Sequence, residues 1–205
     1  MEMRPGDVAD LLDWKRRIFA LYARVREAAD PYAAWKDWRD TRDEMFRTHP
    51  QTPVPEGADF KELPYFDHDP AARVLGEVVV AEQEHFDITT STDGTYGFTR
   101  YGTVHFDLYG KHRSLDCLWV EGYGGGLFLS FRDETSGTET YGACRYLYDT
   151  IKGADLGHEG GQLVLDFNFA YNPSCSYDPR WSCPLAPPNN RLDVAVRAGE
   201  RYPAF

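Results

Sequence analysis

The chain has 205 residues, 42% of them hydrophobic, and its 22 basic and 33 acidic side chains give a formal net charge of −11 at pH 7. This size and composition are typical of a globular domain with a hydrophobic core. Because the excess negative charge repels phosphates and anionic lipids, we expect an acidic protein that binds neither nucleic acid nor membrane.

No stretch of about 18 consecutive apolar residues is present, which argues against a membrane-spanning helix. The first residues also lack the apolar core of a signal peptide, so we expect a cytoplasmic protein. In that compartment the four cysteines, Cys117, Cys144, Cys175 and Cys183, are expected to stay reduced.

The first 50 residues carry a helical pattern in two parts. Between residues 8 and 28, apolar side chains recur at intervals of three and four, as an amphipathic helix requires. Asp30 and Pro31 then favour the start of a second helix, because aspartate can cap free N–H groups and proline suits the first helical position. We therefore predict a helical hairpin over residues 1–50 that packs on the same domain as the rest of the chain.

A proline-rich segment, residues 51–73, separates this hairpin from the remainder and predicts an extended strap. Residues 74–205 show two-residue alternation with glycine-rich turns, which is typical of antiparallel strands. We predict a mainly β fold, an antiparallel barrel or sandwich of about eight strands with an N-terminal helical hairpin. The expected strands lie near residues 74–80, 83–90, 98–109, 113–121, 127–132, 138–148, 162–169 and 191–197.

The stretch "RDETSGTETYGACRYLY", residues 132–148, predicts a β-hairpin whose tip is residues 133–138. On its return strand, Glu139, Tyr141 and Arg145 share one face by the two-residue period. In another predicted strand, Asp166 and Asn168 share a polar face in the same way.

If these two strands are neighbours, Arg145 can pair with Asp166 in a bidentate contact, with Tyr141 and Asn168 completing a hydrogen-bonded patch. The alternative is that both polar stripes are simply the solvent-facing side of an antiparallel sheet, which alternates in the same way. The pattern leaves both interpretations open.

Three long motifs resemble one known family. "FRDETSGTETYGACRYL", "LDFNFAYNPSCSYDPRWSCPLAPPNNRL" and "VRAGERY" are similar to the pattern of the bacterial and archaeal family catalogued as domain of unknown function 1684 (DUF1684). The resemblance implies membership and no activity. Cys144 departs from the pattern, because a glycine is expected at that position; if the glycine allows close backbone approach, a tight site here is in doubt.

Residues 171–190 form a proline-rich loop after the Asp166 strand, and such a loop loses little entropy when it becomes ordered, so it can serve as a lid over the polar stripe. In and beside this loop, Tyr171, Asn172, Asn190 and Arg191 offer groups suited to binding a carboxylate or phosphate. Cys175 and Cys183 are spaced too widely for a zinc knuckle, which favours a buried thiol pair or a disulfide.

The tripeptide His-Phe-Asp occurs at residues 85–87 and again at residues 105–107, each time in a predicted strand. The strands can share a core only if paired residue numbers add to an even number, so a two-residue turn at Asp93-Gly94 is excluded and a three-residue loop or a bulge near Gly94 is needed. His85 can then meet Asp107, and His105 can meet Asp87. Such pairs suit a metal or acid–base site, but they are also ordinary features of an exposed sheet face.

We expect a β-rich protein that binds a small polar or anionic molecule, with hydrolase-like chemistry as its enzymatic form. The alternative is a non-catalytic interaction or assembly module that uses the N-terminal helices, and a homo-oligomer fits either function. No nucleotide-binding or hydrolase motif is present, so no cofactor and no catalytic residue is assigned. The predicted ligand-binding residues are Glu139, Tyr141, Arg145, Asp166, Asn168, Tyr171, Asn172, Asn190 and Arg191; the alternative metal candidates are His85, Asp87, His105 and Asp107.

Overall fold

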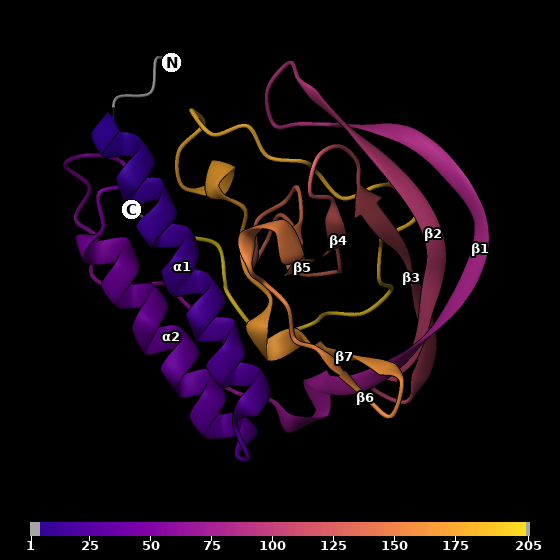
Figure 1. Ribbon diagram of the computed structural model, residues 1–205. Coiled ribbons are helices and arrows are strands. Elements are labelled where there is room, and N and C mark those ends of the chain that lie inside the picture. Colours follow the sequence, from indigo (N-terminus) through magenta and orange to yellow (C-terminus); the bar gives the residue numbers. More distant parts are fainter. Residues whose placement is uncertain (1–4, 204–205) are drawn as a thin grey trace.

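Two helices precede a β-rich remainder in the computed structural model, which describes residues 5–203 (Figure 1). Helix α1 (Pro5–Glu27) and helix α2 (Pro31–Thr48) lie side by side. The Asp30 side chain accepts a hydrogen bond of 2.9 Å from the backbone N–H of Tyr32, and Pro31 occupies the first turn. The predicted helical hairpin and its capping are therefore confirmed.

The remainder forms one antiparallel sheet of seven strands in the order β5-β4-β3-β2-β1-β7-β6. The sheet is open, with β5 and β6 at its edges, so the expected antiparallel β class is confirmed but the sheet does not close into a barrel. The strands are β1 (Arg73–Thr89), β2 (Thr95–Leu108), β3 (Lys111–Val120), β4 (Gly126–Phe131), β5 (Arg145–Asp149), β6 (His158–Glu159) and β7 (Gln162–Asp166).

Strands β1 and β2 are long, and the ladder between them contains a bulge. A bulge bends the strand that contains it. The register shifts between Val80 and Glu84, which joins two predicted strands into β1. Gly102 permits the close approach of the two backbones, since a Cβ atom there would lie 2.7 Å from the carbonyl oxygen of Val79. Every residue pair of this ladder has an even sum, so the predicted register parity is confirmed. The connection is a five-residue loop and not the expected three-residue loop, and the bulge lies between Val80 and Glu84 and not near Gly94.

The main hydrophobic core lies between the concave face of the sheet and the helical hairpin (Figure 1). Trp38 of α2 is fully buried, and its ring centroid lies 5.4 Å from that of Phe169. Phe131 of β4 and Phe167 meet edge to face at 5.1 Å in the same core. The helices therefore cover the open side of the curved sheet and share its core.

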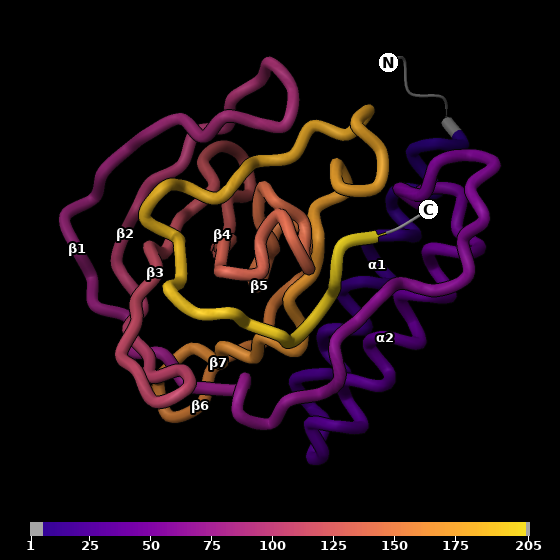
Figure 2. The backbone as a smooth tube through the Cα atoms, turned by 180° about the vertical axis from the view of Figure 1, so that it is seen from behind, coloured from indigo at the N-terminus to yellow at the C-terminus, as the bar shows by residue number. Residues whose placement is uncertain are grey.

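The C-terminal segment, residues 191–203, does not form a strand, contrary to the prediction for residues 191–197. Figure 2 shows it as a yellow segment that crosses the open side of the curved sheet and reaches the helices. Its backbone bonds partly to the backbone of residues 132–134 and partly to the side chains of Asp133 and Arg145, so no regular ladder forms.

The return strand of the predicted hairpin is also shorter than expected. It begins at Arg145, because the N–H groups of Glu139 and Thr140 both donate to the carbonyl oxygen of Thr135 and fold residues 133–144 into a compact loop. Glu139, Tyr141 and Arg145 therefore do not form one strand face. Within residues 5–203, no helix has the length and apolar composition needed to cross a membrane.

Candidate functional site

Arg145 does not pair with Asp166, contrary to the sequence interpretation. Its guanidinium group is buried and lies 3.2 Å from the carboxylate of Asp133, and it donates hydrogen bonds to the backbone oxygens of Val196 (2.9 Å) and Ala198 (2.5 Å). The prediction fails because β5 and β7 are separated by four strands in the sheet order. Arg145 instead attaches the C-terminal segment to the loop of residues 133–144.

Asp166 and Asn168 belong to a separate hydrogen-bonded group. The Asp166 carboxylate accepts hydrogen bonds from the backbone (3.1 Å) and side-chain (2.9 Å) nitrogens of Asn168, and it lies 3.8 Å from the Arg73 guanidinium. The Asn168 amide also makes two hydrogen bonds of 2.8 Å to the backbone of Asp69. Burial raises the pKa of Asp166. All of these contacts hold the residues just before β1 against the C-terminal end of β7.

Asn190 has a similar structural role at the other side of the sheet. Its side-chain oxygen accepts from the N–H of Asp116 (2.8 Å), and its side-chain nitrogen donates to the carbonyl oxygens of Asp116 (3.1 Å) and Ser130 (2.9 Å). The neighbouring Arg191 is exposed to solvent. Asn190 therefore joins the C-terminal segment to β3 and β4.

The remaining residues of the predicted stripe point to different partners. The Glu139 carboxylate pairs with the Arg197 guanidinium at 3.0 Å on the surface, and this pairing lowers the pKa of Glu139. The Tyr141 hydroxyl lies 3.7 Å from the sulfur of Cys175. Of the nine residues predicted to bind a ligand, only Tyr171 and Asn172 line the cleft described next.

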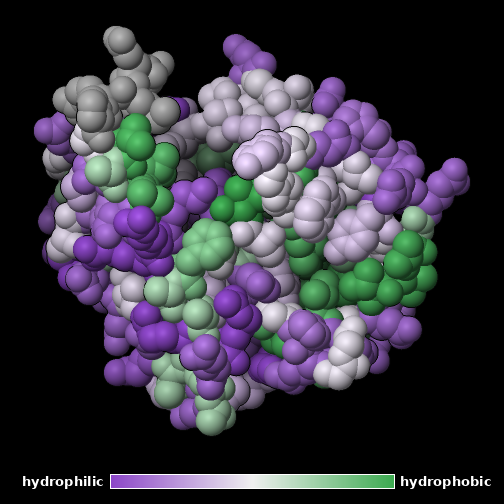
Figure 3. All heavy atoms as spheres, in the orientation of Figure 1, coloured by the Kyte–Doolittle hydropathy of each residue, from purple (hydrophilic) through white to green (hydrophobic). Residues whose placement is uncertain are grey.

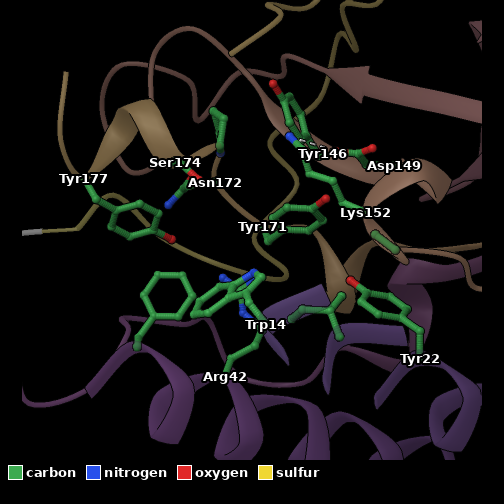
Figure 4. Close-up of a pocket in the computed structure, with 14 residues that line it drawn as sticks. Trp14, Tyr22, Arg42, Tyr146, Asp149, Lys152, Tyr171, Asn172, Ser174 and Tyr177 are labelled. Atoms are coloured by element: carbon green, nitrogen blue, oxygen red, sulfur yellow. Dashed lines mark ion pairs between the residues drawn. The ribbon is translucent and has the colours of Figure 1, made fainter. Parts of the chain in front are cut away.

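A cleft lies between the helical hairpin and the β5 end of the sheet (Figure 4). Its cavity volume is about 80 Å³, and the cleft is partly open to solvent. Trp14 and Ile18 of α1 and Arg42 of α2 form one side, and the Tyr171–Asn172 peptide forms the other. The cleft therefore combines residues from three separate parts of the chain.

Most of the cleft wall is aromatic. The ring centroid of Phe46 lies 5.7 Å from that of Trp14 and 5.2 Å from that of Tyr177. Tyr146 and Tyr171 meet edge to face at 5.7 Å, and their backbones pair across the same edge. Aromatic walls that hold one another in place favour the binding of a flat apolar molecule.

The polar groups behind this wall are already paired. The Arg42 guanidinium lies 2.7 Å from the Glu200 carboxylate, and the pair is almost fully buried. The Tyr177 hydroxyl donates to the same carboxylate, and Arg42 donates to the Tyr65 hydroxyl at 3.3 Å. Burial raises the pKa of Glu200. This network neutralises the Arg42 charge and ties α2 to the C-terminal segment.

Two further polar groups line the cleft, one of them buried and the other exposed to solvent. The side-chain nitrogen of Asn172 donates to the carbonyl oxygen of Arg201 at 2.7 Å, but its buried side-chain oxygen has no hydrogen-bond partner among the described residues. The Lys152 ammonium, 3.3 Å from the Asp149 carboxylate, belongs to a side chain that is 60% exposed. Figure 4 shows the Tyr171 hydroxyl pointing toward this lysine.

The two His-Phe-Asp copies do not assemble a site. The His85 ring nitrogen lies 2.6 Å from the Glu121 carboxylate, and Asp107 contacts His112 at 3.2 Å instead of meeting His85. The β1–β2 register places His85 opposite Thr99, which explains the failed pairing. In the part of the chain that the structure describes, no group of three or more His, Cys, Asp or Glu residues is arranged to hold a metal ion.

The four cysteines are unbridged and buried. Cys144, which stands where the family pattern has glycine, packs in a small cluster with Phe128 and Tyr146. The extra thiol therefore fills core space at this position.

Comparisons with known proteins agree with the motif resemblance. Residues 58–201 match the family described as "Protein of unknown function (DUF1684)", and the chain belongs to this family. A solution NMR structure of an uncharacterized protein from Haloarcula marismortui is 39% identical, with a TM-score of 0.60, covering 82% of this chain and 92% of that one. Among proteins with curated descriptions, none matches.

Sequence reasoning missed most of the cleft. Trp14 and Arg42 read as ordinary helix positions, and Lys152 follows β5 in a short 3-10 turn with no motif around it.

Proposed function

We propose that this cleft binds a small aromatic monocarboxylate that also carries a hydrogen-bond donor on its ring. The observation that carries the proposal is the buried side-chain oxygen of Asn172, which has no partner within residues 5–203. An unsatisfied buried acceptor costs about 1–3 kcal/mol, so a ligand N–H or O–H group that reaches this oxygen, after a side-chain movement exposes it, would recover part of that cost. A flat ring suits the aromatic walls beside it.

The acidic end of such a ligand would lie near Lys152. Both cations of the cleft pair with a carboxylate, but Lys152 is 60% exposed, whereas Arg42 is buried with Glu200. Asp149 stands 3.3 Å from the Lys152 ammonium, so a second negative charge on the ligand would be repelled. These charges favour a monoanion over a phosphate or a dicarboxylate.

A matched pair of ligands tests the donor requirement without changing the protein. Calorimetric titration of the full chain with 4-hydroxybenzoate and 4-methoxybenzoate compares the same carboxylate with and without a ring donor. We expect the hydroxy compound to bind about tenfold more tightly, because only it can donate to Asn172. Equal affinities, or no binding of either compound, would contradict the proposal.

A matched pair of variants tests the charged end. Lys152→Met is expected to weaken binding of 4-hydroxybenzoate about threefold to tenfold, since a partly exposed charge-assisted hydrogen bond is lost. Lys111→Met removes an exposed lysine at the start of β3, far from the cleft, and is expected to leave the affinity unchanged. If both variants bind as the unmodified chain does, the ligand does not use Lys152.

A second function, assembly through the N-terminal helices, is favoured by one observation. Figure 3 shows hydrophobic residues gathered over α1 near its N-terminal end, where Val8, Leu11 and Leu12 are each more than 40% exposed. The tryptophans Trp35 and Trp38, in contrast, are buried in the core and cannot dock a partner. Light scattering tests this function by measuring the molecular mass in solution. If the full chain assembles through α1, Leu12→Glu should lower that mass. A full chain that is already monomeric would exclude the assembly function.

A further inference from the structure

Two bulges lie side by side in the sheet, on the side of the molecule away from the helical hairpin (Figure 1). The ladder between β1 and β2 shifts between Val80 and Glu84, and the ladder between β2 and β3 shifts between Arg100 and Gly102. Because Val80 pairs with Gly102 and Glu84 with Arg100, both shifts occur at the same height of β2. Bulges take residues out of the regular ladder and change the direction of their side chains.

A hollow lies on the sheet at this position, and its lining residues are Gln83, Thr99, Tyr101 and Trp119. Gln83 and Tyr101 belong to the bulges, whereas Thr99 and Trp119 are paired neighbours on β2 and β3. The hollow has a volume of about 520 Å³ and is open to solvent, and it shares no lining residue with the cleft beside the hairpin. Small-molecule pockets have volumes of about 300–1,000 Å³, so the hollow is large enough for a ligand.

Trp119 supplies the main apolar surface of the hollow. Its side chain remains accessible, since the residue is 47% exposed. Its backbone pairs with Thr99 on one side and with Leu127 of β4 on the other. The loop after β3 packs against the edge of the ring, because a Cβ atom at Gly125 would collide with the indole nitrogen. The indole is therefore held in place before any ligand binds, which lowers the entropic cost of binding on its face.

Polar groups stand beside the indole on the same face of the sheet. The Oε1 atom of Glu121 accepts a hydrogen bond of 2.5 Å from the Thr99 hydroxyl and lies 2.6 Å from Nδ1 of His85. Among the residues that the structure describes, neither the Oε2 atom of Glu121 nor the side-chain amide of Gln83 has a hydrogen-bond partner. An amide donates and accepts, and a carboxylate oxygen accepts, so these groups can bond to several hydroxyls of one ligand.

We propose that this hollow binds a neutral saccharide, with one glucose-type ring stacked on the face of Trp119. A pyranose ring with equatorial hydroxyls has C–H groups on its faces and hydroxyls around its edge. The C–H face buries apolar surface against the indole, and the hydroxyls suit Gln83 and Glu121.

The charges around the hollow favour a neutral ligand. None of the four lining residues is charged, and the Glu121 carboxylate beside Thr99 disfavours an anionic sugar. Because Glu121 already pairs with His85, a cationic ligand gains less from this carboxylate. A polar molecule without charge, but with many hydroxyls, therefore fits the groups that are present.

NMR titration of the isotope-labelled full chain with cellotetraose and with maltotetraose tests the proposal, because the two tetrasaccharides present the same ring in different linkages. We expect at least one of them to shift the indole N–H signal of Trp119 in a saturable way. The indole signals of the other tryptophans should not move. No shift of the Trp119 signal with either sugar would overturn the proposal.

Variants then measure the contribution of each group. Trp119→Ala should weaken binding of the sugar about tenfold, whereas Trp119→Phe, which keeps a ring, should lose less. Gln83→Ala should weaken binding about threefold, because a hydrogen bond is lost. Tyr32→Ala removes a similarly exposed ring, 53% accessible, from α2 and should leave the affinity unchanged.

Circular dichroism checks that each variant is folded. If Trp119→Ala is not, Gln83→Ala decides, since it changes only an exposed side chain. Unchanged affinity in the folded Trp119 and Gln83 variants would overturn the proposal.

Two other occupants of the hollow would give different results. A cation on the indole face would shift the Trp119 signal with tetramethylammonium and not with either tetrasaccharide. A second copy of the chain would make the Trp119 signal depend on protein concentration without any ligand, and the sugars would leave it unchanged. Either result would overturn the saccharide site.

Discussion

At the residue scale, the polar side chains of the family motifs satisfy the backbone of the chain itself. Arg145, Asn168 and Asn190 are buried, and each donates to main-chain carbonyl oxygens of a segment distant in sequence. Buried main-chain groups must find partners, and an irregular segment cannot find them in a ladder. A motif rich in buried arginine, asparagine and aspartate is thus explained here by structure before any ligand is considered.

This explanation predicts unequal effects for two arginines that the sequence placed in the same site. Arg145→Met should lower the free energy of unfolding by about 3–5 kcal/mol, because it leaves the Asp133 carboxylate buried without its cation. Arg191→Met, at an exposed position, should change it by less than about 0.5 kcal/mol. Urea denaturation measures both values. Similar small losses in the two variants would show that the Arg145 contacts contribute little.

At the element scale, hydrogen bonds to a few residues of other elements fix the path of the C-terminal segment. Asp133 accepts from the N–H of Val196 at 2.7 Å, and the N–H of Glu200 donates to Ala170 at 2.8 Å. Between these points the chain turns at Gly199, whose φ is +77°. A Cβ atom there would lie 2.5 Å from the carbonyl oxygen of Ala170, so only glycine fits this crossing.

Gly199 and Gly110 have nearly the same φ angle, but only Gly199 is closely packed. Alanine substitutions at the two positions therefore separate the cost of the left-handed backbone from the cost of the steric clash. Gly199→Ala should cost about 3 kcal/mol of unfolding free energy, since it combines a left-handed conformation with a clash against backbone. Gly110→Ala, with φ of +74° and open space around its Cβ position, should cost only about 1 kcal/mol. Thermal and urea denaturation give the comparison. Equal losses would mean that the close approach at Gly199 relaxes freely.

At the scale of the whole molecule, the helices and the sheet share one core. Leu21, Tyr22 and Trp38 from the hairpin are buried in the same cluster as Phe131 and Leu165 from the sheet. The Arg42–Glu200 ion pair joins α2 to the C-terminal segment inside this core. Removing the hairpin would therefore expose apolar surface and leave the Glu200 charge without its partner.

A chain that lacks residues 1–50 is accordingly expected to lose its fixed tertiary packing. Near-UV circular dichroism should show the loss, and urea unfolding of the shortened chain should have no cooperative transition, whereas the full chain unfolds in one step. Leu12→Ser, which changes an exposed residue of α1, should keep the cooperative transition. A shortened chain that still unfolds cooperatively would show that the sheet folds without the helices.

Local sequence patterns predicted the helices and most strands well, but they did not predict which side chains these elements bring together. The Asp30 cap, the helical hairpin and the even register of β1 and β2 depend on residues close in sequence or on strict alternation, so they could be inferred. The strand expected at residues 191–197 could not be corrected from sequence, because alternation also occurs in an extended segment that bonds only briefly to the backbone of residues 132–134 and otherwise to side chains. Membership of the DUF1684 family followed from long motifs.

The sequence by itself determined the class of this protein: a helical hairpin followed by antiparallel strands, in an acidic chain with family motifs near its C-terminal end. Only the tertiary structure decided that Arg145 meets Asp133 and not Asp166, and that Trp14, Lys152 and Asn172 surround one cleft. The physical reason is distance along the chain. Periodicity and capping act over a few residues, whereas strand order and the path of the C-terminal segment bring together side chains that no local pattern connects.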